Sequence, residues 1–325
     1  MARTPPAALL ALIDAGAGFD AEYADGLSNH RPMALLALAG LGADDAQLQR
    51  FARQYDARLR PAPPPVRWPA GDAWASHLGD RAAWPAYRDL FLHWLITEDA
   101  SAVLRQVLPV LMRGCGGAAF HGLIRTAYAV QALHRRELAD ALAYWACCWL
   151  DLGPPMQGRR SDVHAVLRQL HAVPGQHRLI ADAMQAAALQ PGFNAAVAQL
   201  RVTPASLQTL ATLAAHAYAA TRNFAVLHLV TSAHALRTLL PHLDDALPAL
   251  QTYWRAYAAA VCAAGLRDGV APTPLPWPEI VRAALVSDDD HVIKLVHSCR
   301  EQEAAYGAGG PWQAAATRAV AFERA

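Results

Sequence analysis

Lysine is almost absent from this chain of 325 residues: 27 of its 28 basic residues are arginine, and the remaining one is Lys294. The richness in alanine, arginine and proline suggests a coding bias that replaces lysine wherever either cation serves. A lysine kept at position 294 then indicates a role that a guanidinium cannot fill, because arginine stays protonated whereas lysine can lose its charge. The alternative is that one lysine remained by chance.

Paired cysteines, clustered charge and long apolar runs are also missing. Five cysteines without paired spacing predict neither a disulfide framework nor a zinc finger, and a reduced cytoplasmic setting fits them best. A net charge of +1 with 17% charged residues offers no basic surface for nucleic acid. No apolar run reaches the roughly 18 residues of a membrane span, and Asp14 interrupts the apolar N-terminal stretch that resembles a signal peptide. We therefore expect a cytoplasmic protein without membrane or nucleic-acid partners, and a first helix over residues 1–18.

Strand signals are few and helical signals are frequent, and a hydrophobic content of 54% is enough for a large core. Prolines predict an extended connector over residues 61–69, and a second break falls at 153–160. Helices are expected over residues 32–41, 48–59, 87–96, 102–113, 118–133, 137–152, 163–172, 205–221, 224–240, 245–265, 277–286, 289–306 and 312–322. The sequence thus predicts an all-α protein with one irregular multi-helix domain over residues 1–325. A two-lobe split near 153–161 is the alternative.

The clearest group of chemically active residues is the stretch DDDHVIKLVH at 288–297. On a helix, His291, Lys294 and His297 are three residues apart and share one face. Burial lowers the pKa of a lysine, and a neutral amine can capture carbon dioxide as a carbamate. That product is an oxygen ligand that suits Fe(II), Mn(II), Zn(II) or Ni(II) beside imidazoles. The alternative is a solvated helix face with assorted polar groups.

Further histidines lie in or beside apolar helices. His228 and His234 stand where a core helix usually carries leucine, and neutral imidazole is the commonest metal ligand. Since six residues separate them, they lie on different faces, and we expect one ligand and one supporting residue. His121 lies in another apolar helix with Arg125 one turn later, and His30 stands at the mouth of a third. Taken singly, each histidine is more often a hydrogen-bonded core residue.

Competing motifs are weak. The segment GCGGAA at 114–119 formally matches a dinucleotide-binding fingerprint, but a helix-like segment precedes it and no βαβ pattern surrounds it. The chain also has no GxSxG elbow, Walker loop or HExxH motif. Most of the nine tryptophans are interpreted as core residues, and a few could line a flat aromatic pocket.

Four stretches together resemble the questin oxidase-like family. They are LSNHRPMALLA at 27–37, AAFHGLIRTAYA at 118–129, LHLVTSAHALR at 227–237 and DDDHVIKL at 288–295. The resemblance implies a helical oxygenase that acts on aromatic polyketides. Questin oxidases open an anthraquinone ring in an NADPH-dependent step of the Baeyer–Villiger type. Some relatives are understood as non-haem iron dioxygenases with histidine ligands and a carboxylated lysine.

Carried over by motif, the resemblance implies a set of metal ligands. They are His30, His121, His228, His291 and Lys294 as a carbamate. His234 is interchangeable with one of the histidines, and His297 falls outside the matching stretches. We therefore predict a buried Fe(II) site and an oxygenase for dioxygen and a small aromatic, hydroxyquinone-type substrate. His234 is predicted as a supporting catalytic residue and Arg125 as a donor that stabilises a developing oxyanion.

Other functions remain open at this point. They are an NADPH-dependent Baeyer–Villiger monooxygenase, a metal-dependent hydrolase with the same ligands, and a metal-independent helical binding protein. Because the chain lacks a nucleotide-binding pattern, any NADPH would serve to reduce the metal or the quinone. The chain is also shorter than the fungal ring-opening members, so the identity of the substrate stays open. The sequence does not indicate an oligomeric state. We expect the metal-binding histidines to converge beside an enclosed pocket with aromatic walls.

Overall fold

Helices make up most of the structure, a computed structural model that describes residues 6–265 and 268–321. The helices before the break at 153–160 are α1 Ala7–Gly16, α2 Arg31–Leu41, α3 Asp45–Asp56, α4 Trp84–Thr97, α5 Ala100–Leu111, α6 His121–Ala132 and α7 Arg135–Cys147. Those after it are α8 Val163–Leu167, α9 Ile180–Ala188, α10 Phe193–Val197, α11 Ser206–Thr221, α12 Phe224–Leu239, α13 Leu247–Ala264, α14 Trp277–Val286, α15 Asp290–Tyr306 and α16 Trp312–Val320. The prediction of a mainly helical fold is confirmed.

Local sequence signals set several helix ends. Gly42 ends α2 with a left-handed φ of 96°, which glycine adopts without steric cost. Asp44 starts α3 with a capping box: its side chain accepts from the backbone N–H of Gln47, and the Gln47 side chain accepts from Asp44 in return. Asn223 and Asp289 cap α12 and α15 by accepting backbone N–H groups. These two caps therefore fix where the two histidine-rich helices begin.

Some expected boundaries are wrong. The helix expected over 118–133 begins at His121, because residues 117–120 form a 3-10 turn. The helix expected over 163–172 covers only five residues, and the one expected over 137–152 ends at Cys147. The last residue of the helix expected at 312–322 and the first five of the one expected at 1–18 lie outside the described residues.

Three short elements gave no sequence signal. They are α9, α10 and an antiparallel hairpin formed by β1 Glu22–Tyr23 and β2 Leu27–Ser28. In this hairpin Glu22 pairs with Ser28 and Tyr23 with Leu27. Segments of two to nine residues are too short to show a clear hydrophobic period. The hairpin matters because β2 leads directly into His30.

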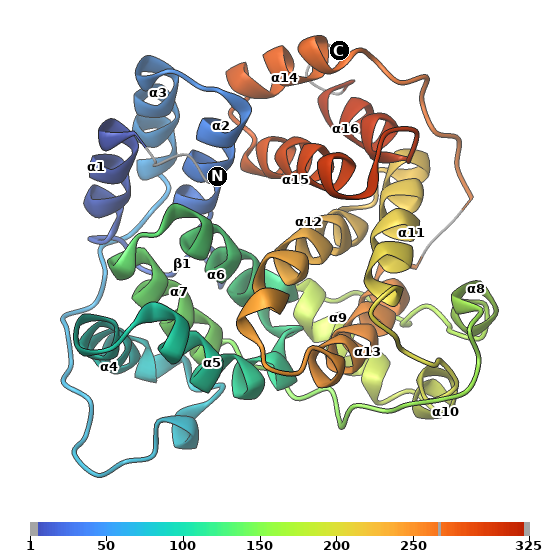
Figure 1. Ribbon diagram of the computed structural model, residues 1–325, viewed down its shortest axis with the longest axis horizontal. Helices are drawn as coiled ribbons and strands as arrows, with labels where there is room; N and C mark the ends of the chain where they lie inside the picture. The colour runs from blue at the N-terminus through green and yellow to red at the C-terminus, as the bar shows by residue number, and fades with distance from the viewer. Residues whose placement is uncertain (1–5, 266–267, 322–325) are drawn as a thin grey trace.

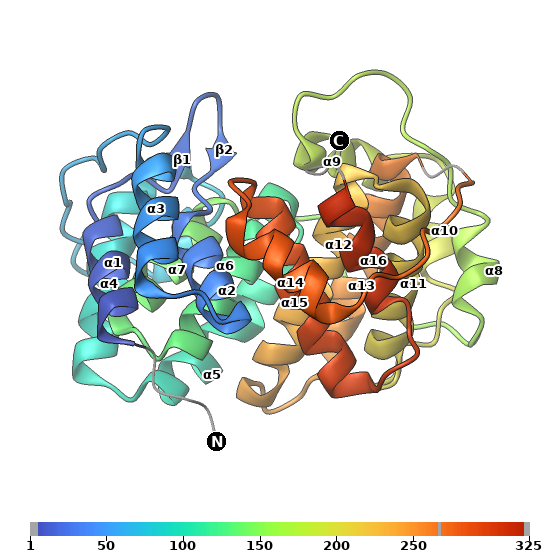
Figure 2. The ribbon, with the colours of Figure 1, turned by 90° about the horizontal axis from the view of Figure 1, so that it is seen from above.

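Two groups of helices meet at a central seam. Helices α1–α7, coloured blue to green, lie on one side of Figure 2, and α8–α13 lie on the other. Across the seam α6 packs against α12. Helix α15 packs against both α2 and α12 and so joins the two groups, as the positions in Figure 1 also show. One apolar core extends through both groups, from Leu9 to Val320. This continuity favours the single domain over the two-lobe split near 153–161.

The interior of the described chain is apolar and closely packed. All five cysteines are buried as free thiols. Trp145, Trp254 and Trp312 are among the largest fully buried side chains, in line with the interpretation of the tryptophans as core residues. No helix among the described residues combines the length and the apolar composition that crossing a lipid bilayer requires.

Candidate metal centre

Four histidines come together at the seam, each within or directly before a different helix. His30 immediately precedes α2, His121 is the first residue of α6, His228 lies in the second turn of α12, and His291 is the second residue of α15. The ring centroid of His30 lies 4.5 Å from that of His121 and 4.7 Å from that of His291. The ring of His228 lies 4.9 Å from His121 and 5.8 Å from His291. We call this group the cavity histidines.

Backbone carbonyls orient two of these rings. Nδ1 of His121 donates a hydrogen bond to the carbonyl oxygen of Ala118, and Nδ1 of His228 donates to that of Phe224 at 2.9 Å. Because a carbonyl oxygen can only accept, the proton of each neutral ring lies on Nδ1. The Nε2 atoms therefore keep free lone pairs. Metal-binding histidines are commonly held in this way, by an acceptor at the other ring nitrogen.

Asp290 lies against the cavity histidines and contacts two of them as well as Lys294. Its Oδ1 is 2.6 Å from Nδ1 of His30, 3.0 Å from Nδ1 of His291 and 3.5 Å from Nζ of Lys294. Burial alone would raise the pKa of Asp290, but His30, His291 and Lys294 lower it well below its usual range. The sequence pattern did not indicate this residue, because an acidic side chain at a helix start is also typical of simple dipole stabilisation.

The Nε2 atoms of His30 and His121 face each other at 2.7 Å. Nδ1 of His121 donates to a carbonyl, and Nδ1 of His30 lies against the carboxylate of Asp290, so both Nε2 atoms carry lone pairs. Two facing lone pairs repel unless a proton or a cation lies between them. Two adjacent imidazole ligands at about 2.1 Å from one metal stand about 3.0 Å apart at a right angle and about 3.4 Å apart at the tetrahedral angle, slightly farther than these two atoms. The ligand atoms of His30, His121 and His291 all lie within 4.8 Å of one another, which fits a single ion.

Burial keeps most of these imidazoles neutral, the form that binds metal. It lowers the pKa of His30 to about 3, and it holds the pKa values of His121 and His228 well below their usual value. Burial also lowers the pKa of His291, but the nearby carboxylate of Asp290 outweighs this effect, so the pKa of this ring is raised overall. His291 is the most exposed of the four, with 21% of its side chain accessible.

Lys294 lies inside the same cluster. Its side chain is 3% exposed, and its Nζ is held 3.5 Å from the Asp290 carboxylate one helical turn earlier. Burial lowers the pKa of Lys294, although Asp290 opposes the shift. The alternative of a solvated helix face is therefore wrong for this residue.

A strained stretch of backbone precedes His121. Ala118, Ala119 and Phe120 have φ values of 45°, 53° and 68°, in the left-handed region that costs non-glycine residues about 1–2 kcal/mol each. Such strain persists where surrounding packing enforces it, and it is common at functional sites. Here it brings the Ala118 carbonyl to Nδ1 of His121.

The glycines of this stretch have a packing role. A Cβ added to Gly117 would stand 1.7 Å from the carbonyl oxygen of Cys148, and one added to Gly116 would meet Leu152 and Met184 at 2.9 and 3.0 Å. Both glycines are buried. The match of residues 114–119 to a dinucleotide fingerprint thus reflects close packing against neighbouring segments.

A cavity of about 460 Å³ opens beside the cavity histidines, and all four contribute to its wall. The hairpin and the loop at 173–179 border it, together with the start of α9. The remaining wall is mainly aliphatic, from residues such as Leu27, Val173, Leu179 and Ile180. Besides the histidines, its aromatic members among the described residues are Tyr23 and Phe224. The expectation of aromatic walls is therefore wrong for most of this lining.

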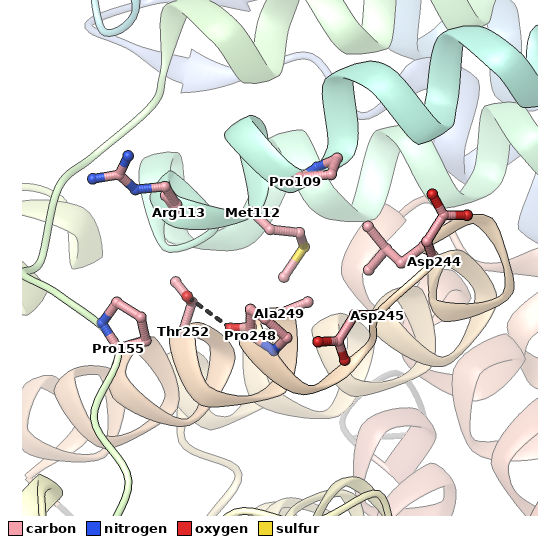
Figure 3. A pocket seen from close by; sticks show the side chains of 10 residues that line it. Pro109, Met112, Arg113, Pro155, Asp244, Asp245, Pro248, Ala249 and Thr252 are labelled. Carbon is pink, nitrogen blue, oxygen red and sulfur yellow. Dashed lines mark hydrogen bonds between the residues drawn. The ribbon is translucent and has the colours of Figure 1, made fainter.

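A second cavity, of about 360 Å³, lies between α5 and the start of α13 (Figure 3). Met112 and Pro109 face Pro248 and Ala249 across it, and Arg113 stands at its edge. It shares no lining residue with the histidine-lined cavity, and none of its described lining residues is a histidine or cysteine. The four converging histidines therefore line the first cavity and not this one.

The comparison with protein families agrees with this placement. A family model described as questin oxidase-like matches residues 27–299. The chain belongs to this family. Membership indicates an enzyme of the oxygenase type. No curated protein matches the chain significantly. All four cavity histidines and Lys294 fall within the part of the chain that the questin oxidase-like model covers.

Arg125 lies outside this centre of the questin oxidase-like chain. Its Nε and Nη2 donate to the carboxylate of Glu137 at 2.7 and 3.0 Å, which joins α6 to α7. It does not line the histidine-lined cavity. The structure thus gives no geometric support to the predicted oxyanion contact.

His234 and His297 form a separate buried group, which we call the inner histidine pair. Their ring centroids are 5.5 Å apart, and neither lines the cavity. The structure therefore distinguishes residues that the sequence left interchangeable. His228 and His291 face the cavity, while His234 and His297, farther along the same helices, do not.

Proposed function

We propose that the protein is a non-haem iron-dependent oxygenase that acts on a small aromatic substrate of the hydroxyquinone or polyketide type. The observation that carries the proposal is the pair of facing Nε2 atoms of His30 and His121, within four histidines that line one cavity. Imidazole nitrogens suit iron among several metals, and the oxygenase-type family favours iron among them.

In this proposal His30, His121, His228 and His291 hold Fe(II) through nitrogen, and a carbamate on Lys294 adds an oxygen ligand. The bound iron supplies the redox chemistry that dioxygen needs in order to react with an organic substrate. Asp290 acts as a positioning residue, because it accepts hydrogen bonds from Nδ1 of His30 and His291 and so aims both rings.

The cavity binds the substrate and limits water at the reacting end. Its volume of about 460 Å³ lies within the range of small-molecule sites. The ring of Phe224 lies 5.0 Å from His228 and 4.8 Å from His291 in edge-on contacts, so it adds an apolar group to the wall beside these two rings. Since Gly116 and Gly117 are closely packed against neighbouring segments, the proposal treats NADPH only as an external reductant. Arg125 then has a structural role through Glu137.

Replacement of Lys294 tests the ligand set. We expect Lys294→Arg to lose iron and oxygen consumption, because a guanidinium stays protonated and cannot form a carbamate. Lys294→Ala should also be inactive, but acetate or propionate should partly restore iron binding by filling the gap with an oxygen ligand. Elemental analysis and an oxygen electrode with 1,8-dihydroxyanthraquinone measure both properties.

The results separate the competing functions. Stoichiometric zinc without oxygen consumption would favour a hydrolase, and a folded protein without stoichiometric metal would favour a binding module. If Lys294→Arg retains iron and turnover like the parent protein, the carbamate is wrong and the single lysine is an accident of composition.

A further inference from the structure

The mouth of the histidine-lined cavity carries two arginines. Arg81 and Arg178 both line it, and both bind the β1–β2 hairpin. Arg81 forms an ion pair with Glu22, so its charge is already compensated. Arg178 donates to the backbone carbonyl oxygen of Asp25, which is a neutral acceptor. Within the described ranges, the ion pairs do not include Arg178. One guanidinium at the mouth therefore lacks a carboxylate partner.

One acidic side chain also lines this part of the cavity. Asp182 lies in the first turn of α9, where the partial positive charge of the helix start offsets part of its charge. It forms no ion pair with Arg178 among the described residues. The charge of Arg178 thus remains available to a ligand.

The arginine end and the histidine end lie at different places along the cavity. Asp25, which holds Arg178, is five residues before His30 in a chain that includes β2. Asp25 stands in the turn of the hairpin, whereas His30 follows the second strand and precedes α2. Leu27, Leu179 and Ile180 line the wall, and they suit an apolar body.

We infer that the substrate is an aromatic acid whose carboxylate binds Arg178 at the mouth, while its apolar ring system reaches the cavity histidines. This inference rests on the proposed function, since it takes the histidine end as the place of reaction. A guanidinium binds a carboxylate through two parallel hydrogen bonds, which fixes the orientation of the ligand as well as its affinity. Arg178 is then a specificity-determining residue that selects acidic over neutral aromatic compounds.

Paired probes test the inference. Anthraquinone-2-carboxylate and the neutral 2-(hydroxymethyl)anthraquinone share one ring system and differ in charge. We expect Arg178→Gln in the full-length protein to weaken binding of the carboxylate about tenfold at low salt, and to leave the neutral probe within about twofold. The affinity of Arg178→Lys for the carboxylate probe should fall between those of the parent protein and Arg178→Gln. Lysine keeps the positive charge but lacks the planar guanidinium that makes two parallel hydrogen bonds. Arg113→Gln, at the edge of the other cavity, is the matched control (Figure 3).

Titration calorimetry of each variant gives the affinities, and metal content and oxygen consumption are measured on the same samples. Selective loss of the carboxylate probe supports the inference, even if the protein proves to hold no iron, in which case the proposed function alone fails. Equal loss of both probes, equal loss in Arg113→Gln, or no binding of the carboxylate to the parent protein overturns it. Iron-dependent oxygen consumption alongside such a result would leave the proposed function standing.

Discussion

Two of the cavity histidines lie on the same helices as the inner histidine pair, but the two groups have different surroundings. α12 supplies His228 to the first group and His234 to the second, and α15 supplies His291 and His297. In each helix six residues, or about 9 Å along the axis, separate the two. The first group lines a cavity, and the Nε2 atoms of two of its members, His30 and His121, face each other.

In the inner histidine pair, neighbouring side chains lie against the ring nitrogens. Nδ1 of His234 lies 3.2 Å from Oγ of Ser298, and Nδ1 of His297 lies 3.1 Å from the hydroxyl of Tyr128. The Nε2 atom of His297 lies so close to Gly40 that an added Cβ would stand 2.4 Å away. A buried histidine in an apolar helix is thus suited to bind a ligand only where its second nitrogen has both space and a converging partner.

The largest difference between the two groups should be in metal binding. We expect His121→Ala to lower iron affinity by more than about 100-fold, since even the loss of a partner behind a metal ligand costs about 10–100-fold. His234→Ala, which removes a buried ring of the same size from the inner pair, should bind iron within about twofold of the parent. Metal titration of both variants, with circular dichroism to confirm folding, makes the comparison. Equal metal loss in the two would contradict the division into two groups.

A smaller effect is expected from the carboxylate behind the cavity histidines. Asp290→Asn keeps the shape but removes the charge that orients His30 and His291, and should weaken iron binding by about 10–100-fold. Asp288→Asn is the control, because Asp288 is half-exposed and pairs with Arg50 at the surface. The same metal titration applies. Parallel losses in both variants would show a general charge effect.

The smallest effect concerns acid stability of the inner pair. Burial, with Arg300 adding, lowers the pKa of His297 to about 4, against about 6.5 in the unfolded chain. The unfolded state therefore binds more protons as pH falls from about 6.5 towards 4, and stability is lost over that window. Between pH 7 and pH 5 this single group should cost about 2 kcal/mol. Urea unfolding should show that His297→Gln loses that much less stability on acidification than the parent; an unchanged difference would refute a neutral, buried His297.

Particular residues show how far the sequence indicated the site. His30, His121, His228, His291 and Lys294 stood out because an imidazole or amine in an apolar helix needs a partner. Their chemistry depends only on residue type and local pattern, which the sequence contains. Asp290 did not stand out, because its importance comes from the rings that converge on its carboxylate across 260 residues of chain.

The sequence by itself determined the helical class, the breaks at proline and glycine, and the titratable residues that apolar helices carry. These follow from local spacing and side-chain chemistry. Tertiary structure alone decided that His228 and not His234 faces the cavity, because helix packing sets which side of α12 meets α6. It also decided the left-handed turn before His121 and the hairpin at the cavity mouth. Both are held by contacts with distant segments, which no short stretch of sequence encodes.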